Sequence, residues 1–192
     1  MINDATIIEQ TQQWVSSVIV GLNFCPFAKR ELEKETIHFQ VSHESGLDSS
    51  LKECLHEIID ECKRLDEHPQ IKTTLLIFAT AFENFDDYLD FVELANGLMI
   101  EQGYEGIYQL ASFHPRYCFE GEDDNDAANY TNRSPYPMLH LLREDSLEQA
   151  LENYPDPESI PERNIVVARE KGLAKMKKML ESCIKVKDGK DA

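Results

Sequence analysis

The chain has 192 residues, of which 42% are hydrophobic and 29% charged, a composition that suits one globular domain rather than a disordered segment. Its 36 acidic and 19 basic side chains give a formal net charge of −17, which repels nucleic-acid phosphates and anionic lipid surfaces. We therefore expect neither a nucleic-acid partner nor a membrane partner.

The cysteines and the N-terminal segment predict a cytoplasmic protein. The five cysteines form an odd set without the spacing of a disulfide framework. Residues 1–13 lack the basic-then-apolar order of a secretory signal, and no apolar run reaches the roughly 18 residues of a membrane span. We expect one domain over residues 1–186, followed by a disordered tail over residues 187–192.

The spacing of apolar side chains predicts alternating helices and strands. In chain order these are a helix over residues 4–22, a short helix over 26–33, a strand over 37–41, a helix over 51–65, a strand over 73–79, a helix over 85–101, strands over 107–113 and 138–142, a helix over 145–153, and a last helix over about 165–180. The continuous apolar run at 73–79 indicates a strand covered on both faces. In the helix over 85–101 the residues expected to be buried are Phe85, Tyr88, Leu89, Val92, Ala95 and Met99.

This order predicts an α/β layered sandwich. We expect a small mixed sheet of about four strands, three of them parallel, flanked by helices, because strands that alternate with helices form parallel crossovers. A ferredoxin-like α+β arrangement of the same elements is the alternative.

A long segment without periodicity, residues 114–137, separates the last two strands. Its acidic first half, 120–126, is typical of solvated or disordered chain. Its second half, 129–137, holds two tyrosines, two prolines and many hydrogen-bonding side chains, which favours an ordered loop that forms a site. The segment also starts at the carboxyl end of a strand, the edge at which open parallel sheets bind ligands.

Four short motifs resemble a known family. They are Leu22-Asn23-Phe24-Cys25-Pro26-Phe27-Ala28, Phe113-His114-Pro115, Asn132-Arg133-Ser134-Pro135-Tyr136-Pro137 and His140-Leu141-Leu142-Arg143-Glu144. In this order they are similar to domain-of-unknown-function family 1415, an uncharacterised bacterial family. The resemblance runs over most of the chain but implies no reaction. It adds weight to Cys25, His114, Asn132, Arg133, His140 and Arg143 as positions of interest.

Two of these residues could act in catalysis. His114 could serve as a general acid or base. Cys25 lies at the expected start of a helix, where the helix dipole lowers a thiol pKa and favours a nucleophilic thiolate. The structural alternatives are a histidine that only hydrogen-bonds the loop and a half-buried thiol at a corner between helices.

The remaining positions could bind substrate. Arg133 and Arg143 could grip a phosphate or carboxylate in bidentate geometry, or could form internal ion pairs that hold the loop. Asn132, Tyr136 and His140 are further candidates for substrate binding, although His140 lies in an apolar strand pattern typical of a core histidine.

Metal binding has weak support in the sequence. His114 and Cys118 with Cys25 or His140 would suit zinc, and the acidic run 120–126 offers oxygen ligands for magnesium or calcium. Neither pattern matches a known metal motif, and the sequence specifies no metal, cofactor or oligomeric state.

These features lead to three functional hypotheses. The first is an enzyme that acts on a small anionic substrate, carrying a phosphate or carboxylate, in a pocket built by residues 114–143. The second is a non-catalytic module that binds a protein or ligand through the loop. The third is a metal-binding or thiol-redox protein.

Overall fold

A four-stranded sheet forms the centre of the protein. The computed structural model describes residues 2–45, 50–152 and 154–185. Its strands are β1 (Ile37–Ser42), β2 (Thr73–Phe78), β3 (Tyr108–Phe113) and β4 (Met138–Arg143), arranged in the order β1-β2-β4-β3. β1 pairs in parallel with β2, and β4 pairs antiparallel with both β2 and β3.

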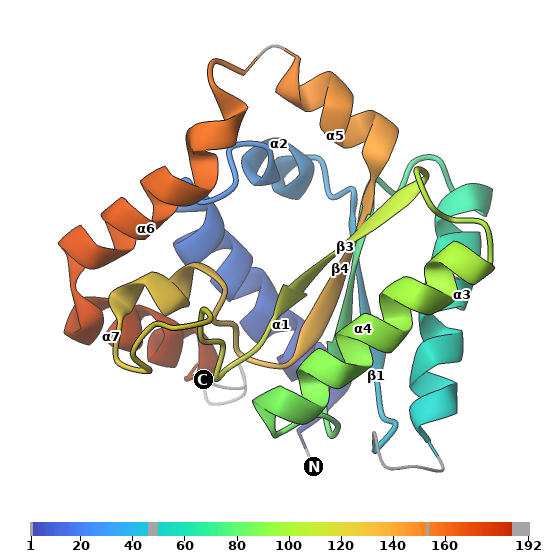
Figure 1. Cartoon of the computed structure of the whole chain (residues 1–192), viewed down its shortest axis with the longest axis horizontal. Coiled ribbons are helices and arrows are strands. Elements are labelled where there is room, and N and C mark those ends of the chain that lie inside the picture. Colours follow the sequence, from blue (N-terminus) through green and yellow to red (C-terminus); the bar gives the residue numbers. More distant parts are fainter. Residues whose placement is uncertain (1, 46–49, 153, 186–192) are drawn as a thin grey trace, which may run out of the picture.

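Helices cover both faces of this sheet (Figure 1). On one face lie α3 (Leu51–Glu67) and α4 (Phe85–Glu101). The other face is covered by α1 (Asp4–Trp14), α2 (Ala28–Glu33), α6 (Ile160–Lys171) and α7 (Leu173–Ile184), while α5 (Glu144–Leu151) follows β4. No helix among the described residues is long and apolar enough to cross a membrane.

Strand β2 lies between two hydrophobic cores. All six of its residues are buried, as its continuous apolar run predicts. Leu76 and Phe78 pack with α3 and α4, whereas Leu75 and Ile77 pack with the helices of the other face. Because side chains alternate across a strand, one strand contributes to both cores. The layered α/β architecture is therefore confirmed.

The prediction of three parallel strands is wrong. Only β1 and β2 pair in parallel, because β4 inserts between β2 and β3. β2 and β3 run in the same direction without pairing, so the crossover through α4 is a split βαβ unit. The ferredoxin-like alternative does not fit either, since β1 lies directly beside β2 with no antiparallel strand between them.

Two predicted helices differ from those observed. The helix expected over 4–22 is α-helical only to Trp14 and continues as a π-helical segment, η1 (Val15–Val20). The last helix is two helices, because Gly172 adopts a φ of 78° between α6 and α7. The tail over 187–192 and the helix end expected at Asn153 lie outside the described residues.

The π-helical segment generates a test of backbone packing. A Cβ at Gly21, directly after η1, would lie 2.3 Å from the Ser17 carbonyl oxygen. We expect Gly21→Ala to lower the free energy of unfolding by about 1–3 kcal/mol, since rigid backbone must move to admit the methyl group. The measurement is urea denaturation.

Gly97→Ala in the middle of α4 is the matched control. A Cβ there meets no atom within 4 Å, so this change should raise the free energy of unfolding by about 0.4–1 kcal/mol through the lower entropy of the unfolded chain. Equal effects of the two substitutions would contradict the packing at Gly21.

Candidate functional site

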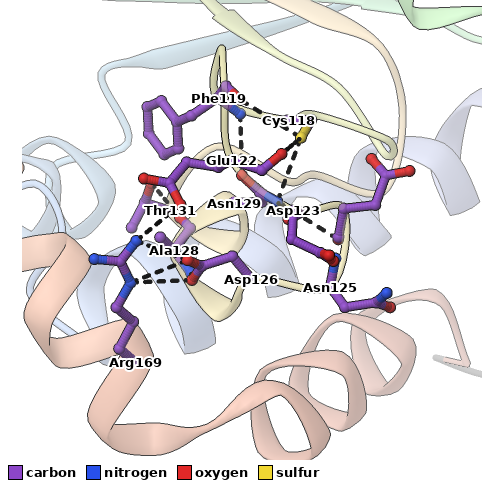
Figure 2. Close-up of polar contacts among 11 residues, drawn as sticks. Cys118, Phe119, Glu122, Asp123, Asn125, Asp126, Ala128, Asn129, Thr131 and Arg169 are labelled. Carbon is purple, nitrogen blue, oxygen red and sulfur yellow. Dashed lines mark hydrogen bonds and ion pairs between the residues drawn. The ribbon is translucent and has the colours of Figure 1, made fainter.

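The segment 114–137 folds around one buried amide. Its 3₁₀ helix η2 (Ala127–Thr131) consists entirely of buried residues, and Asn129 is fully buried. The Asn129 side chain accepts a hydrogen bond from the Phe119 backbone N–H at 3.0 Å and donates one to the Asp123 carbonyl at 2.9 Å (Figure 2). These bonds close the acidic half of the segment onto η2, so residues 114–137 form an ordered loop.

Side chains from distant helices hold this loop in place. The indole N–H of Trp14 donates to the Arg133 carbonyl at 3.0 Å. Arg169 of α6 lies 2.7 Å from an Asp126 carboxylate oxygen and 3.2 Å from one of Glu122 (Figure 2). Because the Arg169 guanidinium and the Ala128 backbone N–H bond its carboxylate, the pKa of Asp126 is lowered to about 2. The ion pair therefore persists throughout the neutral range.

A groove of about 660 Å³ lies between the first half of this loop and the beginning of α4. The helix contributes residues 84–86 and Leu89, the end of β3 contributes Ser112, and the loop contributes the rest. The complete lining is Asn84, Phe85, Asp86, Leu89, Ser112, Arg116, Tyr117, Cys118, Glu120 and Asp124. The groove therefore lies at the carboxyl end of β3, where the sequence predicted a site.

His114 fixes the geometry around this groove from the protein interior. Its ring is fully buried between the rings of Phe85 and Tyr88, with centroids 5.1 Å from each. Nδ1 accepts the Arg116 backbone N–H at 3.0 Å, so Nε2 carries the proton and donates to the Phe82 carbonyl at 2.8 Å. Desolvation lowers the pKa of His114, which keeps the ring neutral. Both nitrogens are used, which leaves none to exchange a proton with a ligand.

The Phe82 carbonyl belongs to a strained turn. Phe82 has a φ of 60°, a left-handed conformation that is costly for a large side chain. The hydrogen bond from His114 and the stacking of Phe82 on Phe91, at 4.2 Å between centroids, hold this conformation. His114 thereby positions the turn before α4 and, through Arg116, the start of the loop.

Arg133 and Arg143, the two arginines predicted to bind an anion, lie far apart, and each donates to backbone carbonyls. Arg133 donates to the carbonyls of Tyr117 and Asp124, both at 2.9 Å, and ties the loop together. Arg143 lies at the opposite end of β4 from Met138, where it donates to the carbonyls of Leu65 and Ile71 beside the C-terminus of α3. The structure therefore does not bring Arg143 together with His114 and Arg133.

The other predicted substrate-binding residues bond within the protein. Asn132 Oδ1 accepts from the Thr131 hydroxyl at 2.9 Å, and the Tyr136 hydroxyl donates to Gln10 of α1. His140 Nε2 lies 2.6 Å from the Thr73 hydroxyl oxygen, and desolvation lowers the pKa of His140 to about 4. None of these three residues lines the groove.

Cys25 does not have the activated thiol expected from its sequence position. Burial raises the pKa of its thiol, although backbone N–H groups of Phe27 and Ala28 act in the opposite direction. The helix that follows has only six residues and begins at Ala28, so its dipole is short. Desolvation outweighs these dipoles, and the thiol stays protonated at neutral pH.

Metal-binding geometry is not found in the described part of the chain. No group of three or more His, Cys, Asp or Glu side chains there could hold a metal ion. In the acidic run, Glu122 and Asp126 are paired with Arg169 instead, which places a positive charge where a cation would have to bind.

The groove contains residues that the sequence argument did not select. Leu89, predicted to be buried, is 44% exposed on its wall, and Arg116 is exposed on its other side. In the first turns of α4 the apolar residues cover a wider arc of the helix than one buried face requires. This width is a weak sequence signal that one of them, Leu89, is exposed. Arg116 could not be distinguished from Arg133 by sequence, since both lie in the same loop.

A second polar cluster is buried between α3 and the β1–β2 pair. His38 Nε2 lies 3.8 Å from Glu61 Oε2, and neither atom has a hydrogen-bond partner among the residues that the structure describes. Glu57 Oε2 and Thr74 Oγ1 are likewise buried without such partners, and Thr74 pairs with His38 in the sheet register. Burial raises the pKa of Glu57. Buried polar atoms without partners are costly, so this cluster destabilises the fold.

Comparison with known proteins identifies a family for most of the chain. The model of a family described as "Protein of unknown function (DUF1415)" matches residues 6–178. Neither the curated proteins nor the solved structures give a match.

The hydrogen bonds of His114 predict a structural role for this residue. We expect His114→Ala to lower the free energy of unfolding by about 2–4 kcal/mol, because it leaves the Phe82 carbonyl and the Arg116 N–H without partners and creates a cavity. His56→Ala, at an exposed position on α3, should change it by less than about 0.5 kcal/mol. Denaturant unfolding of both variants checks this, and a small loss for His114→Ala would contradict the assigned hydrogen bonds.

The buried cluster predicts a pH-dependent gain from a neutral side chain. Because the pKa of Glu57 is raised in the folded state, its contribution to stability is present at acid pH and is lost as the pH rises through that pKa. Glu57→Gln should therefore raise the melting temperature at pH 7, with a smaller gain at pH 4. Glu53→Gln, at an exposed position on the same helix, should change it little at either pH. A gain for Glu57→Gln that is larger at pH 4 would refute this account of the cluster.

Proposed function

The chain belongs to the DUF1415 family of proteins of unknown function, and we propose that it binds a small molecule with an anionic group in the groove between α4 and the 114–137 loop. The observation that carries this proposal is the guanidinium of Arg116. Of the lining residues, Arg116 is the only arginine or lysine. It is exposed and forms no ion pair or side-chain hydrogen bond with the residues that the structure describes.

This state of Arg116 contrasts with that of Arg133 and Arg143. Their guanidinium groups donate to backbone carbonyls, so both already have hydrogen-bond partners within the fold. Arg116 keeps its planar set of donors available for a carboxylate or phosphate. We therefore propose that Arg116, rather than Arg133 or Arg143, binds the anionic group.

The walls of the groove suit a small organic molecule. The rings of Phe85 and Tyr117 lie 5.4 Å apart between centroids and tilt by 58°, and Leu89 adds an exposed apolar side chain nearby. Pockets for small ligands combine such apolar surface with a few polar groups, and a volume of about 660 Å³ lies within their usual range.

The groove favours binding over catalysis. Cys118 is the thiol on its lining, and desolvation together with Asp124 raises the pKa of that thiol. His114, whose ring packs against Phe85 of the lining, uses both ring nitrogens in backbone hydrogen bonds. A nucleophile needs a lowered pKa or a base strong enough to deprotonate it. The Asp124 carboxylate beside Cys118 is too weak a base for a thiol whose pKa is raised, and His114 has no free nitrogen to act as one. We therefore propose a ligand-binding protein rather than an enzyme.

Titration of the ¹⁵N-labelled protein with monocarboxylates, amino carboxylates and inorganic phosphate tests this proposal. We expect amide shifts at the groove residues, and a loss of affinity of about tenfold or more in Arg116→Gln, because a charge-assisted bidentate contact is removed. Arg30→Gln is the control, since Arg30 is exposed on α2 and remote from the lining. The proposal fails if none of these probes, amino carboxylates included, shifts the groove amides or if both variants bind like the natural protein.

A further inference from the structure

The lining of the groove carries more negative than positive side chains. Three carboxylates, those of Asp86, Glu120 and Asp124, line it together with the single guanidinium of Arg116. Asp86 and Glu120 are exposed and take part in no ion pair among the described residues. The lining therefore carries an excess of negative charge, in a protein whose net charge is also strongly negative.

A ligand that carries only negative charge does not suit this lining. A phosphate placed at Arg116 would lie in the field of the nearby carboxylates, whose repulsion is strong where water is partly excluded. The N-terminus of α4 does not compensate for this. The Asn84 side chain accepts from the backbone N–H groups of Asp86 and Asp87, and the carboxylates of these two aspartates neutralise the positive end of the helix dipole. The usual features of a phosphate site at a helix start are thus already occupied.

A ligand that carries only positive charge leaves Arg116 unsatisfied. An ammonium group would be attracted by the carboxylates and by the faces of Phe85 and Tyr117, but it would be repelled by the guanidinium on the same lining. The lining is complemented when a ligand brings a negative charge to Arg116 and a positive charge to the carboxylates and aromatic rings.

We propose, on the basis of the function proposed above, that the groove binds a small zwitterion: an amino carboxylate whose carboxylate contacts Arg116 and whose ammonium group lies among Asp86, Asp124 and the aromatic rings. The net charge of such a ligand is zero, so the negative field of the whole protein does not oppose its approach. Discrimination comes from the pair of opposite charges, since a ligand that lacks one of them leaves a partner in the groove without its counter-charge.

The test compares matched probes on the full chain by ¹⁵N chemical-shift titration. The probes are ω-amino carboxylates of two to six carbons, monocarboxylates and monoamines of the same lengths, and inorganic phosphate. We expect at least one amino carboxylate to bind about tenfold or more tightly than its carboxylate and its amine counterparts. The inference is overturned if phosphate or a monocarboxylate binds as tightly as every amino carboxylate.

Substitution of acidic residues on the lining separates this inference from the function on which it rests. Asp86→Asn and Asp124→Asn should each weaken amino carboxylates by several fold while leaving monocarboxylates equal or tighter, whereas Asp87→Asn, in the same helical turn but not on the lining, should do neither. If monocarboxylates bind through Arg116 and an amine adds nothing, anion binding stands and the zwitterion is refuted. If no probe shifts the groove amides, the proposed function itself fails.

Discussion

The insertion of β4 between β2 and β3 sets the position of the 114–137 loop and of the groove beside it. Because β4 pairs antiparallel with β3, Phe113 and Met138 are paired across the sheet, and the intervening chain must leave and return at one point. The two ends of the loop therefore lie side by side at one edge of the sheet, and the residues between them must pack against one another. Asn129 makes this possible, because its buried side-chain amide, in the second half of the loop, bonds the backbone of Phe119 and Asp123 in the first half.

The same constraint explains how the charged side chains are used. A long irregular segment exposes many backbone carbonyls, and Arg133 satisfies two of them while Arg169 clamps the acidic half to α6. His114 does the same for the turn before α4. His114 and Arg133, which the sequence marked as candidates for catalysis and anion binding, are therefore occupied by hydrogen bonds within the fold. The Arg116 side chain has no ion pair or hydrogen bond among the described residues, and it lies on the groove that the folded loop forms with α4.

The features that local forces decide could be predicted from the sequence. The positions of the strands, the both-sided burial of β2 and the boundaries of α4 follow from side-chain periodicity and from short-range capping. Prediction failed where a choice depends on distant chain. The periodicity of the last helix continues through Gly172, yet the chain breaks there because that glycine adopts a positive φ, and Leu89 fits the apolar stripe of α4 but faces an open groove.

The sequence by itself determined the layered α/β class, the existence of the 114–137 loop and its place at the carboxyl end of a strand, because each is written in local patterns of apolar and polar residues. Only the tertiary structure decided the strand order and which of His114, Arg116, Arg133 and Arg143 remains free to meet a ligand. Arg116 and Arg133 lie in the same loop, but only Arg133 has backbone carbonyls within hydrogen-bond distance of its guanidinium group among the described residues. That distance is set by contacts between residues far apart in the chain, such as Trp14 with Arg133 and Arg143 with Leu65.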